Sequence, residues 1–213
     1  MSQDDGSAEI VRIPVEFYFD YICPFCYVAS ARLDRLAARY PLDIRYRFVE
    51  IHPDNPPQGR PVSELGYPPE QWQRMTAALE EMVAEDQLPF AERTFTTNSR
   101  KAILLALATL NQRPASFPAL HRALFHAYFA EQRNIGDESV LRELAETQGV
   151  GDICDAAWTT ETYLQRMLAD VEAAQRIGLT GVPTLVVGPR AFAGAVSIDT
   201  LEEALRREGV EEY

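Results

Sequence analysis

Two cysteines, Cys23 and Cys26, lie where an apolar, aromatic run gives way to a helical pattern. The run, residues 15–22, is typical of a buried strand, and residues 28–39 have the apolar spacing of a helix. Two thiols three positions apart at such a junction can reach each other and form a redox pair. The free N–H groups and the positive dipole end of the helix favour a thiolate at Cys23, whereas Cys26 lies one turn into the helix and suits a resolving role.

Two other interpretations of the pair are half of a zinc site and two inert buried thiols. A structural zinc ion needs four ligands, and the rest of the chain offers Cys154 and three histidines, His52, His121 and His126. These residues form neither a second CxxC pair nor an HxxxH pair, so we expect no metal site. We expect Cys154 to be a half-buried free thiol, and His121 and His126 to pack within a helix.

The composition narrows the class of partner. The 213 residues are 46% apolar, enough for a sizeable core, and a formal charge of −12 gives no basic face for nucleic acid or anionic membranes. Residues 1–9 are polar and acidic, unlike a secretory signal, and no apolar stretch is long enough to span a bilayer. With only three cysteines, we expect a cytoplasmic protein whose CxxC pair is catalytic.

The periodicity predicts strands first, then helices, then strands again. Alternating or continuous apolar runs predict strands at 10–19, 43–49 and 184–187, with 192–194 as a hairpin partner for the last. Helical patterns cover 24–40, 68–86, 100–111, 116–132, 137–149, 160–177 and 199–208, and residues 51–61 are a predicted loop.

This order predicts an α/β, thioredoxin-like fold, βαβ followed by ββα, interrupted by a large all-helical insertion. The first strand, helix and strand have the spacing of a right-handed βαβ unit. We expect a disordered tail at 1–8, a thioredoxin-like domain made of 9–60 and 160–213, and a helical insertion domain at 61–159.

A second motif, Gly181-Val182-Pro183-Thr184, opens the third predicted strand. A proline at the first residue of a strand is acceptable for purely structural reasons. In thioredoxin-like proteins, however, the peptide bond before this proline is cis and lies beside the CxxC pair. We therefore expect a cis Val182–Pro183 bond, with Val182 and Pro183 binding a substrate chain.

The CPFC motif, the helical insertion and the GVPT motif together resemble the DsbA family of thiol-disulfide oxidoreductases, and most of all its cytosolic FrnE-like branch. The resemblance extends from about Val15 to Leu205. It includes four further segments, residues 98–99, 124–129, 134–137 and 140–145.

The resemblance implies disulfide exchange with protein or small thiol substrates, in which Cys23 attacks and Cys26 resolves. It implies no cofactor apart from glutathione as a redox co-substrate. The strongly oxidising members have histidine where this chain has Phe25, so we expect a less oxidising dithiol.

The kappa-class glutathione transferases and 2-hydroxychromene-2-carboxylate isomerases share this fold and provide the alternative function. They typically have serine at the position of Cys23 and use it to activate glutathione. They also carry an arginine after an acidic motif that follows the final strand, and residues 194–200 of this chain lack that arginine. Ser197 and Asp199 fit the N-terminal cap of the last helix instead. The two retained cysteines favour disulfide exchange.

Three side chains near the dithiol have candidate roles. Asp20, three residues before Cys23, either tunes the thiols and relays a proton or caps the helix. Glu16 is either a buried carboxylate beside the dithiol or part of a solvated strand face. Phe25 is expected to pack or to contact substrate. The predicted partners are disulfide- or dithiol-containing proteins and glutathione, with neither nucleic acid nor membrane, and no sequence feature assigns an oligomeric state.

Overall fold

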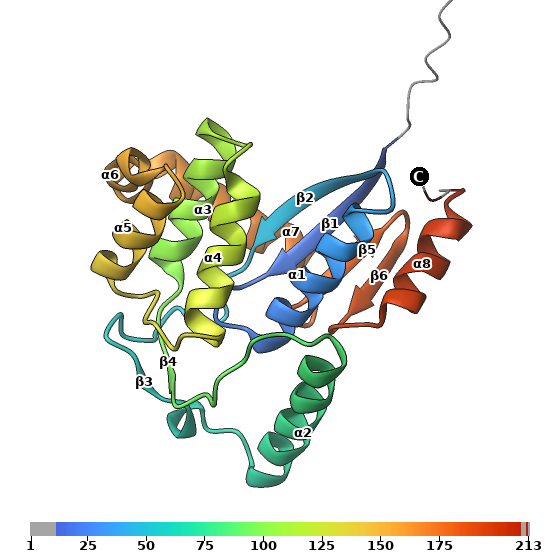
Figure 1. The fold of residues 1–213 in the computed structure, drawn as a ribbon, viewed down its shortest axis with the longest axis horizontal. Helices are drawn as coiled ribbons and strands as arrows, with labels where there is room; N and C mark the ends of the chain where they lie inside the picture. Colours follow the sequence, from blue (N-terminus) through green and yellow to red (C-terminus); the bar gives the residue numbers. More distant parts are fainter. Residues whose placement is uncertain (1–11, 210–211, 213) are drawn as a thin grey trace, which may run out of the picture.

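The computed structural model describes residues 12–209 and 212 of the chain. Its central sheet consists of β1 Ile13–Phe19, β2 Leu42–Phe48, β5 Thr184–Val187 and β6 Arg190–Ala193. The strand order is β2-β1-β5-β6 (Figure 1), with β1 parallel to β2 and with β5 antiparallel to both β1 and β6. The predicted disordered tail, 1–8, and residues 10 and 11 of the predicted first strand lie outside the described residues.

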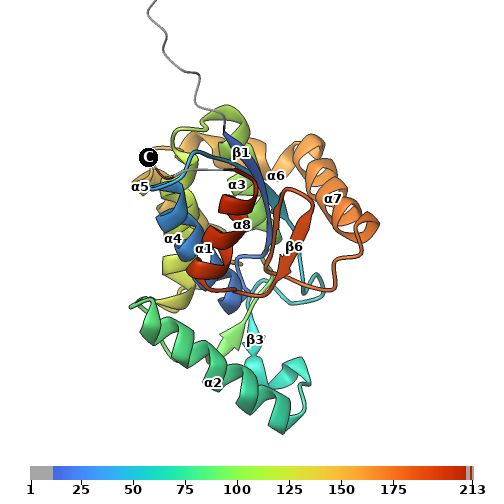
Figure 2. The ribbon, with the colours of Figure 1, turned by 90° about the vertical axis from the view of Figure 1, so that its right-hand side faces the viewer.

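Helices cover both faces of this sheet (Figures 1 and 2). α1 (Pro24–Ala37) and α8 (Ile198–Arg207) pack on one face, and α7 (Glu161–Arg176) lies against β2 on the other. Because both faces are covered, the last residues of β1 are buried whichever way they point, which explains the apolar run there. No helix within residues 12–209 and 212 is long and apolar enough to cross a membrane.

Local sequence sets several element ends. The Asp137 carboxylate accepts a hydrogen bond from a backbone N–H two residues on and begins α5 (Glu138–Thr147), as predicted. The Ser197 hydroxyl accepts a hydrogen bond from the Thr200 N–H and caps α8, which is also as predicted. Gly188 has a φ of 55°, a left-handed conformation that favours glycine, in the two-residue turn between β5 and β6.

A helical block and a small second sheet lie between β2 and α7 in the sequence. They comprise β3 Arg60–Pro61, a 3₁₀ turn Val62–Leu65, α2 Pro69–Glu85, β4 Phe95–Thr96, α3 Arg100–Gln112, α4 Phe117–Phe129, α5, a 3₁₀ turn Gly151–Ile153 and α6 Cys154–Thr159. α3 to α6 gather at one end of the central sheet, whereas α2 stands apart (Figure 1). β3 and β4 pair antiparallel.

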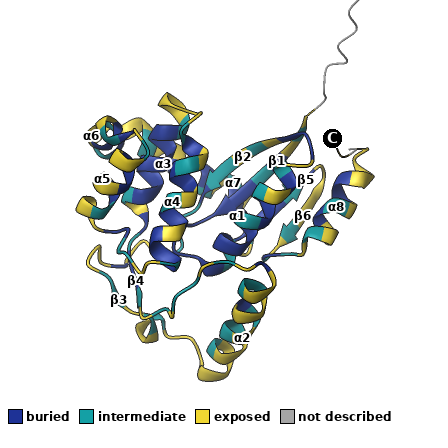
Figure 3. Cartoon of the chain, in the orientation of Figure 1, coloured by how far each residue is buried: buried dark blue, intermediate teal, exposed yellow. Residues whose placement is uncertain are grey.

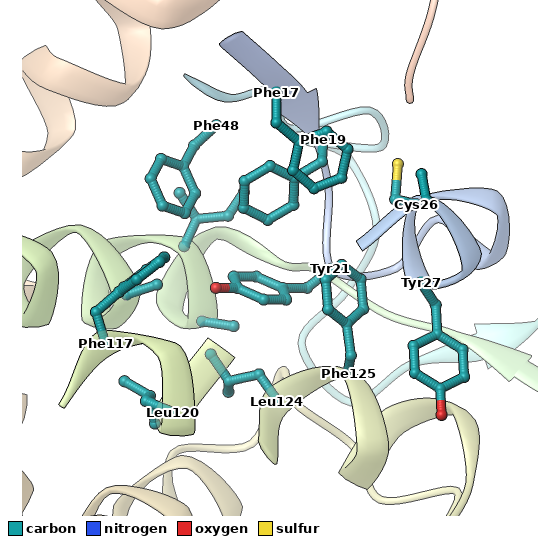
Figure 4. Close-up of a cluster of buried hydrophobic side chains, with 14 of the residues drawn as sticks. Phe17, Phe19, Tyr21, Cys26, Tyr27, Phe48, Phe117, Leu120, Leu124 and Phe125 are labelled. Atoms are coloured by element: carbon teal, nitrogen blue, oxygen red, sulfur yellow. The ribbon is translucent and has the colours of Figure 1, made fainter. Parts of the chain in front are cut away.

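One continuous core joins the central sheet to the helical block (Figures 3 and 4). The ring of Tyr21, just beyond β1, lies 4.9 Å from the ring of Phe125 in α4. Tyr27 of α1 stacks on Phe129 of α4 with centroids 5.4 Å apart. The predicted order of elements is confirmed, but one core spans both parts, so the separate insertion domain at 61–159 stays a prediction.

Three predicted features differ from the structure. The helix predicted for 24–40 ends at Ala37, because the chain turns before Pro41, which disfavours helical backbone in the residue preceding it. The segment 51–61, predicted to be a loop, contains β3. Its two residues are too few to show the alternation of apolar and polar side chains that identifies a strand. α6, which was not predicted, has only six residues, and Cys154 at its start is fully buried, although it was predicted to be half-buried.

Candidate active site

The end of β1 and the start of α1 position the two cysteines. The Cys23 N–H donates a 3.2 Å hydrogen bond to the Asp20 carbonyl oxygen, which turns the chain out of the strand. Cys23 is then the N-cap residue of α1, with Pro24 in the first turn. That turn contains no acidic side chain that would compete with a Cys23 thiolate for the helix dipole. The predicted position of the two cysteines at a strand-to-helix junction is confirmed, and their action as a redox pair stays a prediction.

The two thiols of the pair have different surroundings. All three cysteines of the chain are free thiols. Cys23 retains 5% exposure, whereas Cys26 has none. Burial, and then hydrogen bonding to the Cys23 sulfur, raise the pKa of the Cys26 thiol well above its ordinary value. Cys26 therefore stays protonated at neutral pH until a base removes its proton.

The proline loop faces the dithiol. The Val182–Pro183 peptide bond is cis, as predicted. The Cys23 thiol donates a long hydrogen bond, 3.7 Å, to the Val182 carbonyl oxygen. The Gly194 N–H donates to the Pro183 carbonyl oxygen at 2.8 Å, which holds the loop against the end of β6. The structure therefore brings the two sequence motifs together across most of the chain.

Asp20 is completely buried, and its charge acts on the Cys26 thiol. Its carboxylate accepts hydrogen bonds from the Ile51 N–H at 2.8 Å and from the Ile22 N–H at 3.3 Å, and it does not cap α1. Burial raises the pKa of Asp20 to about 6 despite these hydrogen bonds. Of the two roles considered for Asp20, helix capping is therefore wrong, and tuning of the thiols stays a prediction.

Glu16 does not lie at the dithiol. It accepts hydrogen bonds from Arg47 of β2 and, at 3.0 Å, from the Tyr18 hydroxyl. Arg47 also donates at 3.1 Å to the buried Asp170 of α7. Burial acts to raise the pKa of Glu16, but these hydrogen bonds and the arginine charge lower it overall. Glu16 belongs to the sheet face that α7 covers, opposite to α1, and is thereby kept from the thiols.

A buried histidine that sequence reasoning assigned only to helix packing joins both flanks of the CPFC segment to α4. His121 shares 2.9 Å hydrogen bonds with the Tyr21 hydroxyl through Nδ1 and with the Ser30 hydroxyl through Nε2. Burial lowers the pKa of His121 to about 3, so the ring is neutral, with one nitrogen donating and the other accepting. Its partners lie 100 and 91 residues away in sequence, and no local pattern indicates them.

A cavity of about 660 Å³ opens beside the dithiol, between the start of α1 and α2. Pro24 and Phe25 of the CPFC motif line one side, and Phe25 is half-buried there. The other side consists mainly of apolar side chains from α2 and the segment after it, Trp72, Met75, Leu79, Val83 and Phe90. Arg93 also lines the cavity. The spacing of the apolar residues in α2 is visible in the sequence and predicts an apolar stripe along the helix. The sequence does not show what that stripe faces.

Other candidate ligand residues are dispersed. Within residues 12–209 and 212, no three His, Cys, Asp or Glu side chains lie close enough to hold a metal ion. His126, predicted to pack within its helix, is instead exposed, and its Nδ1 lies 3.3 Å from a Glu131 carboxylate oxygen. The lack of a metal site stays a prediction.

Residues 14–206 match the family described as DSBA-like thioredoxin domain. The chain belongs to this family. The predicted thioredoxin-like fold and the suspected DsbA relationship are therefore confirmed, and the CPFC dithiol and cis-proline loop of this DSBA-like protein lie within the matched residues.

Relatives of this DSBA-like chain include both named enzymes and uncharacterised proteins. It is 27% identical to the uncharacterised protein YwbO of Bacillus subtilis, covering 93% of this chain and 98% of that one. It is also 27% identical to a 2-hydroxychromene-2-carboxylate isomerase of Sphingobium xenophagum, covering 90% of this chain and 97% of the isomerase.

Solved structures show the same fold. A probable DsbA oxidoreductase from Streptomyces coelicolor superposes with a TM-score of 0.78 at 25% identity, covering 93% of this chain and 91% of that chain. The cytosolic disulfide reductase DsbM from Pseudomonas aeruginosa, solved with GSH, superposes with a TM-score of 0.68 at 20% identity. The match covers 91% of this chain and 100% of the DsbM chain. The likeness to DsbM is one of fold.

Proposed function

We propose that this DSBA-like protein is a thiol-disulfide oxidoreductase whose dithiol is Cys23 and Cys26. The observation that carries the proposal is the asymmetry of the pair. Cys23 begins a helix and contacts the Val182 carbonyl oxygen, whereas Cys26 is buried and protonated behind it. A nucleophile with a shielded second thiol is what disulfide exchange requires.

In the reducing direction, the Cys23 thiolate attacks one sulfur of a substrate disulfide and displaces the other as a thiolate. The product is a mixed disulfide between Cys23 and the substrate. Cys26 then loses its proton and attacks the Cys23 sulfur, which releases the second substrate thiolate. Two electrons pass from the dithiol to the substrate, and the released thiolates take up protons from solvent. The reverse sequence oxidises a substrate dithiol.

Asp20 is the proposed proton acceptor for the second step. Because burial raises its pKa to about 6, the carboxylate is ionised at neutral pH and is a stronger base than a surface aspartate. Its charge already acts on the Cys26 thiol, the group that must lose a proton. Asp20 accepts that proton as Cys26 attacks.

Substrates approach across the proline loop and the CPFC motif. Val182 and Pro183 bind the substrate chain, and Phe25 contacts it from the cavity side. Disulfide- or dithiol-containing proteins are the proposed substrates, with glutathione as co-substrate and no other cofactor; the fold likeness to DsbM, solved with GSH, supports glutathione. We place the protein in the cytoplasmic, FrnE-like branch, on its motifs and its few cysteines.

The isomerase relative supports a second candidate, a glutathione-dependent isomerase or transferase. The match to it covers 90% of this chain. In that reaction Cys23 activates glutathione and Cys26 has no step. Residues 194–200, directly after β6, lack the arginine expected of such enzymes, and Ser197 caps α8.

Trapping separates the two candidates. Tagged Cys26→Ser protein should attack substrates and stall, so a non-reducing gel from cells should show adducts that disappear with reductant. The double variant with Cys23→Ser is the control and should show none. If no adducts form and Cys26→Ser still isomerises or conjugates glutathione substrates normally, disulfide exchange is the wrong reaction.

A further inference from the structure

The cavity beside the dithiol combines apolar walls with an arginine that has no carboxylate partner. Among the described residues, 12–209 and 212, Arg93 forms no ion pair, and its Nε is buried without a hydrogen-bond partner. The chain as a whole carries a charge of −12, so carboxylates are abundant. A guanidinium that lines a cavity and has no carboxylate partner can bind an anionic group of a ligand there.

The charge of Arg93 affects the pKa of two neighbouring side chains, and its guanidinium lies near a third. Burial lowers the pKa of His52, and the charges of Arg60 and Arg93 lower it further. Burial raises the pKa of Tyr128, although the charge of Arg93 and a hydrogen bond between the two side chains act against that rise. The Arg93 guanidinium also lies 6.0 Å from the centre of the Trp72 ring. The cation is thus held between the cavity wall and the protein interior.

The α2 wall of the cavity is anchored at its C-terminal end. Asp86, the buried C-cap residue of α2, accepts hydrogen bonds from Arg32 at 2.6 Å and from Arg35 at 2.7 Å, both in α1. Within α2 only Leu79 is buried, so most of the helix's apolar face is left partly exposed beside the cavity (Figure 3). Covering that face with an apolar ligand removes it from water, which is favourable.

Two carboxylates, Glu80 and Glu92, also line the cavity. Both residues are exposed, so solvent and salt screen their charges. Neither forms an ion pair with Arg93, whose Nε is shielded from solvent. Arg93 is therefore the charged side chain of the cavity that interacts most strongly with a charged ligand, and the ligand charge that it attracts is negative.

We infer that the cavity takes a small aromatic disulfide bearing a carboxylate, with its ring against Phe25 and Trp72 and its carboxylate on Arg93. This inference rests on the proposed disulfide exchange at Cys23. The volume of about 660 Å³ suits a small-molecule ligand. Pro24 and Phe25, which line the cavity, directly follow Cys23 in the chain, so a ligand whose ring fills the cavity is placed to extend its disulfide towards the attacking sulfur.

The chemistry is the exchange described above. The Cys23 thiolate attacks one ligand sulfur and expels one aromatic thiolate, and Cys26 then attacks the Cys23 sulfur and expels the other. The dithiol is oxidised by two electrons, and the aromatic disulfide is reduced to two thiols.

Rate constants with matched disulfides test the inference. The probes are 5,5′-dithiobis(2-nitrobenzoate), an aromatic disulfide with carboxylates, and 2,2′-dithiodipyridine, a neutral aromatic one. Each is mixed with the reduced full-length protein, and the released thiol is followed by absorbance in a stopped-flow instrument. Arg93→Gln should slow the reaction with the carboxylate reagent about tenfold or more, since a charge-assisted hydrogen bond is lost. Its rate with the neutral reagent should change by less than about twofold, and Arg93→Lys should restore part of the loss.

Two controls fix the interpretation. Arg74→Gln removes the same charge from an exposed position of α2 that does not line the cavity, and it should leave both rates within about twofold of the original protein. Iodoacetamide, which is small and neutral, should alkylate Cys23 at the same rate in all variants, which shows that the thiolate itself is unchanged. Thermal unfolding followed by circular dichroism establishes that Arg93→Gln is folded.

The inference is overturned if Arg93→Gln slows both aromatic reagents equally, or if Arg74→Gln slows the carboxylate reagent as much as Arg93→Gln does. It is also overturned if Arg93→Gln slows the reduction of insulin disulfides by the same factor, because the cavity then serves a protein chain. If Cys23 exchanges with no disulfide at all, the proposed function fails as well, and that result is distinct from these.

Discussion

Replacing Asp20 by asparagine removes a buried charge at the dithiol while keeping the shape of the side chain. Burial raises the pKa of this carboxyl from 3.8 to about 6, so between these values the folded chain holds a proton that the unfolded chain has released. The contribution of Asp20 to stability is therefore fully present below pH 3.8 and is lost as the pH rises towards 6. The loss is about 1.4 kcal/mol per pH unit, roughly 3 kcal/mol in all.

Asparagine does not titrate, so the Asp20→Asn variant lacks this loss. Relative to the original protein, its free energy of unfolding should rise by about 2 to 3 kcal/mol between pH 4 and pH 7. The substitution also has a constant cost, because the amide nitrogen cannot accept one of the two backbone hydrogen bonds, from Ile22 and Ile51. That cost is roughly 1 to 3 kcal/mol, so the variant should be less stable at pH 4 and about equally stable at pH 7.

Urea unfolding of both reduced proteins at pH 4, 5, 6 and 7 measures the difference directly. The titration of His121 acts in the opposite sense, since its lowered pKa makes stability fall as the pH drops below 6.5, but it is common to both proteins and cancels in the difference. A difference that stays constant from pH 4 to 7 would refute the reasoning, because Asp20 would then titrate normally. The proposed role of Asp20 as a base would fall with it.

Three further predictions rest on the burial of the cysteines, the His121 hydrogen bonds and the raised pKa of Asp20. Brief iodoacetamide treatment should label Cys23 and leave Cys26 and Cys154 unlabelled, because only Cys23 retains any exposure, 5%; early labelling of Cys154 in peptide mass mapping would contradict this. His121→Phe should lower the free energy of unfolding in urea by roughly 2 to 5 kcal/mol, since two buried hydroxyls lose their partner; a loss below about 1 kcal/mol would mean that they find other acceptors or donors. Resolution of the mixed disulfide, followed by stopped flow, should quicken as the pH rises through about 6 and should lose that step in Asp20→Asn.

Features set by neighbouring residues were predictable from the sequence. The start of α1 at Pro24, the caps at Asp137 and Ser197, and the bounds of β5 all depend on a few adjacent side chains. The cis bond before Pro183 followed from the motif and its expected position beside a dithiol. In each case the determining interaction spans only a few residues or is tied to a known motif.

Features set by distant contacts were not predictable. Glu16 was a candidate for a buried carboxylate beside the dithiol, because alternation along a strand separates two faces but does not say which face α1 will cover. Asp20 lies beyond the end of β1, where alternation no longer assigns a face. The His121 bridge and the Arg93 cavity depend on how α4 and the segment after α2 pack against α1. The helical block carries these partners, and nothing in its periodicity specifies its orientation on the sheet.

The His121 bridge makes the CPFC segment and the helical block a single cooperative unit. The histidine bonds to the chain on both sides of the CPFC segment, so that segment cannot open while α4 stays packed on the sheet. Backbone amides around the dithiol therefore exchange their hydrogens only in the larger opening that separates α4 from β1. The lifetime of the native dithiol geometry is thus set by the packing of a helix that contributes no atom to the proposed exchange.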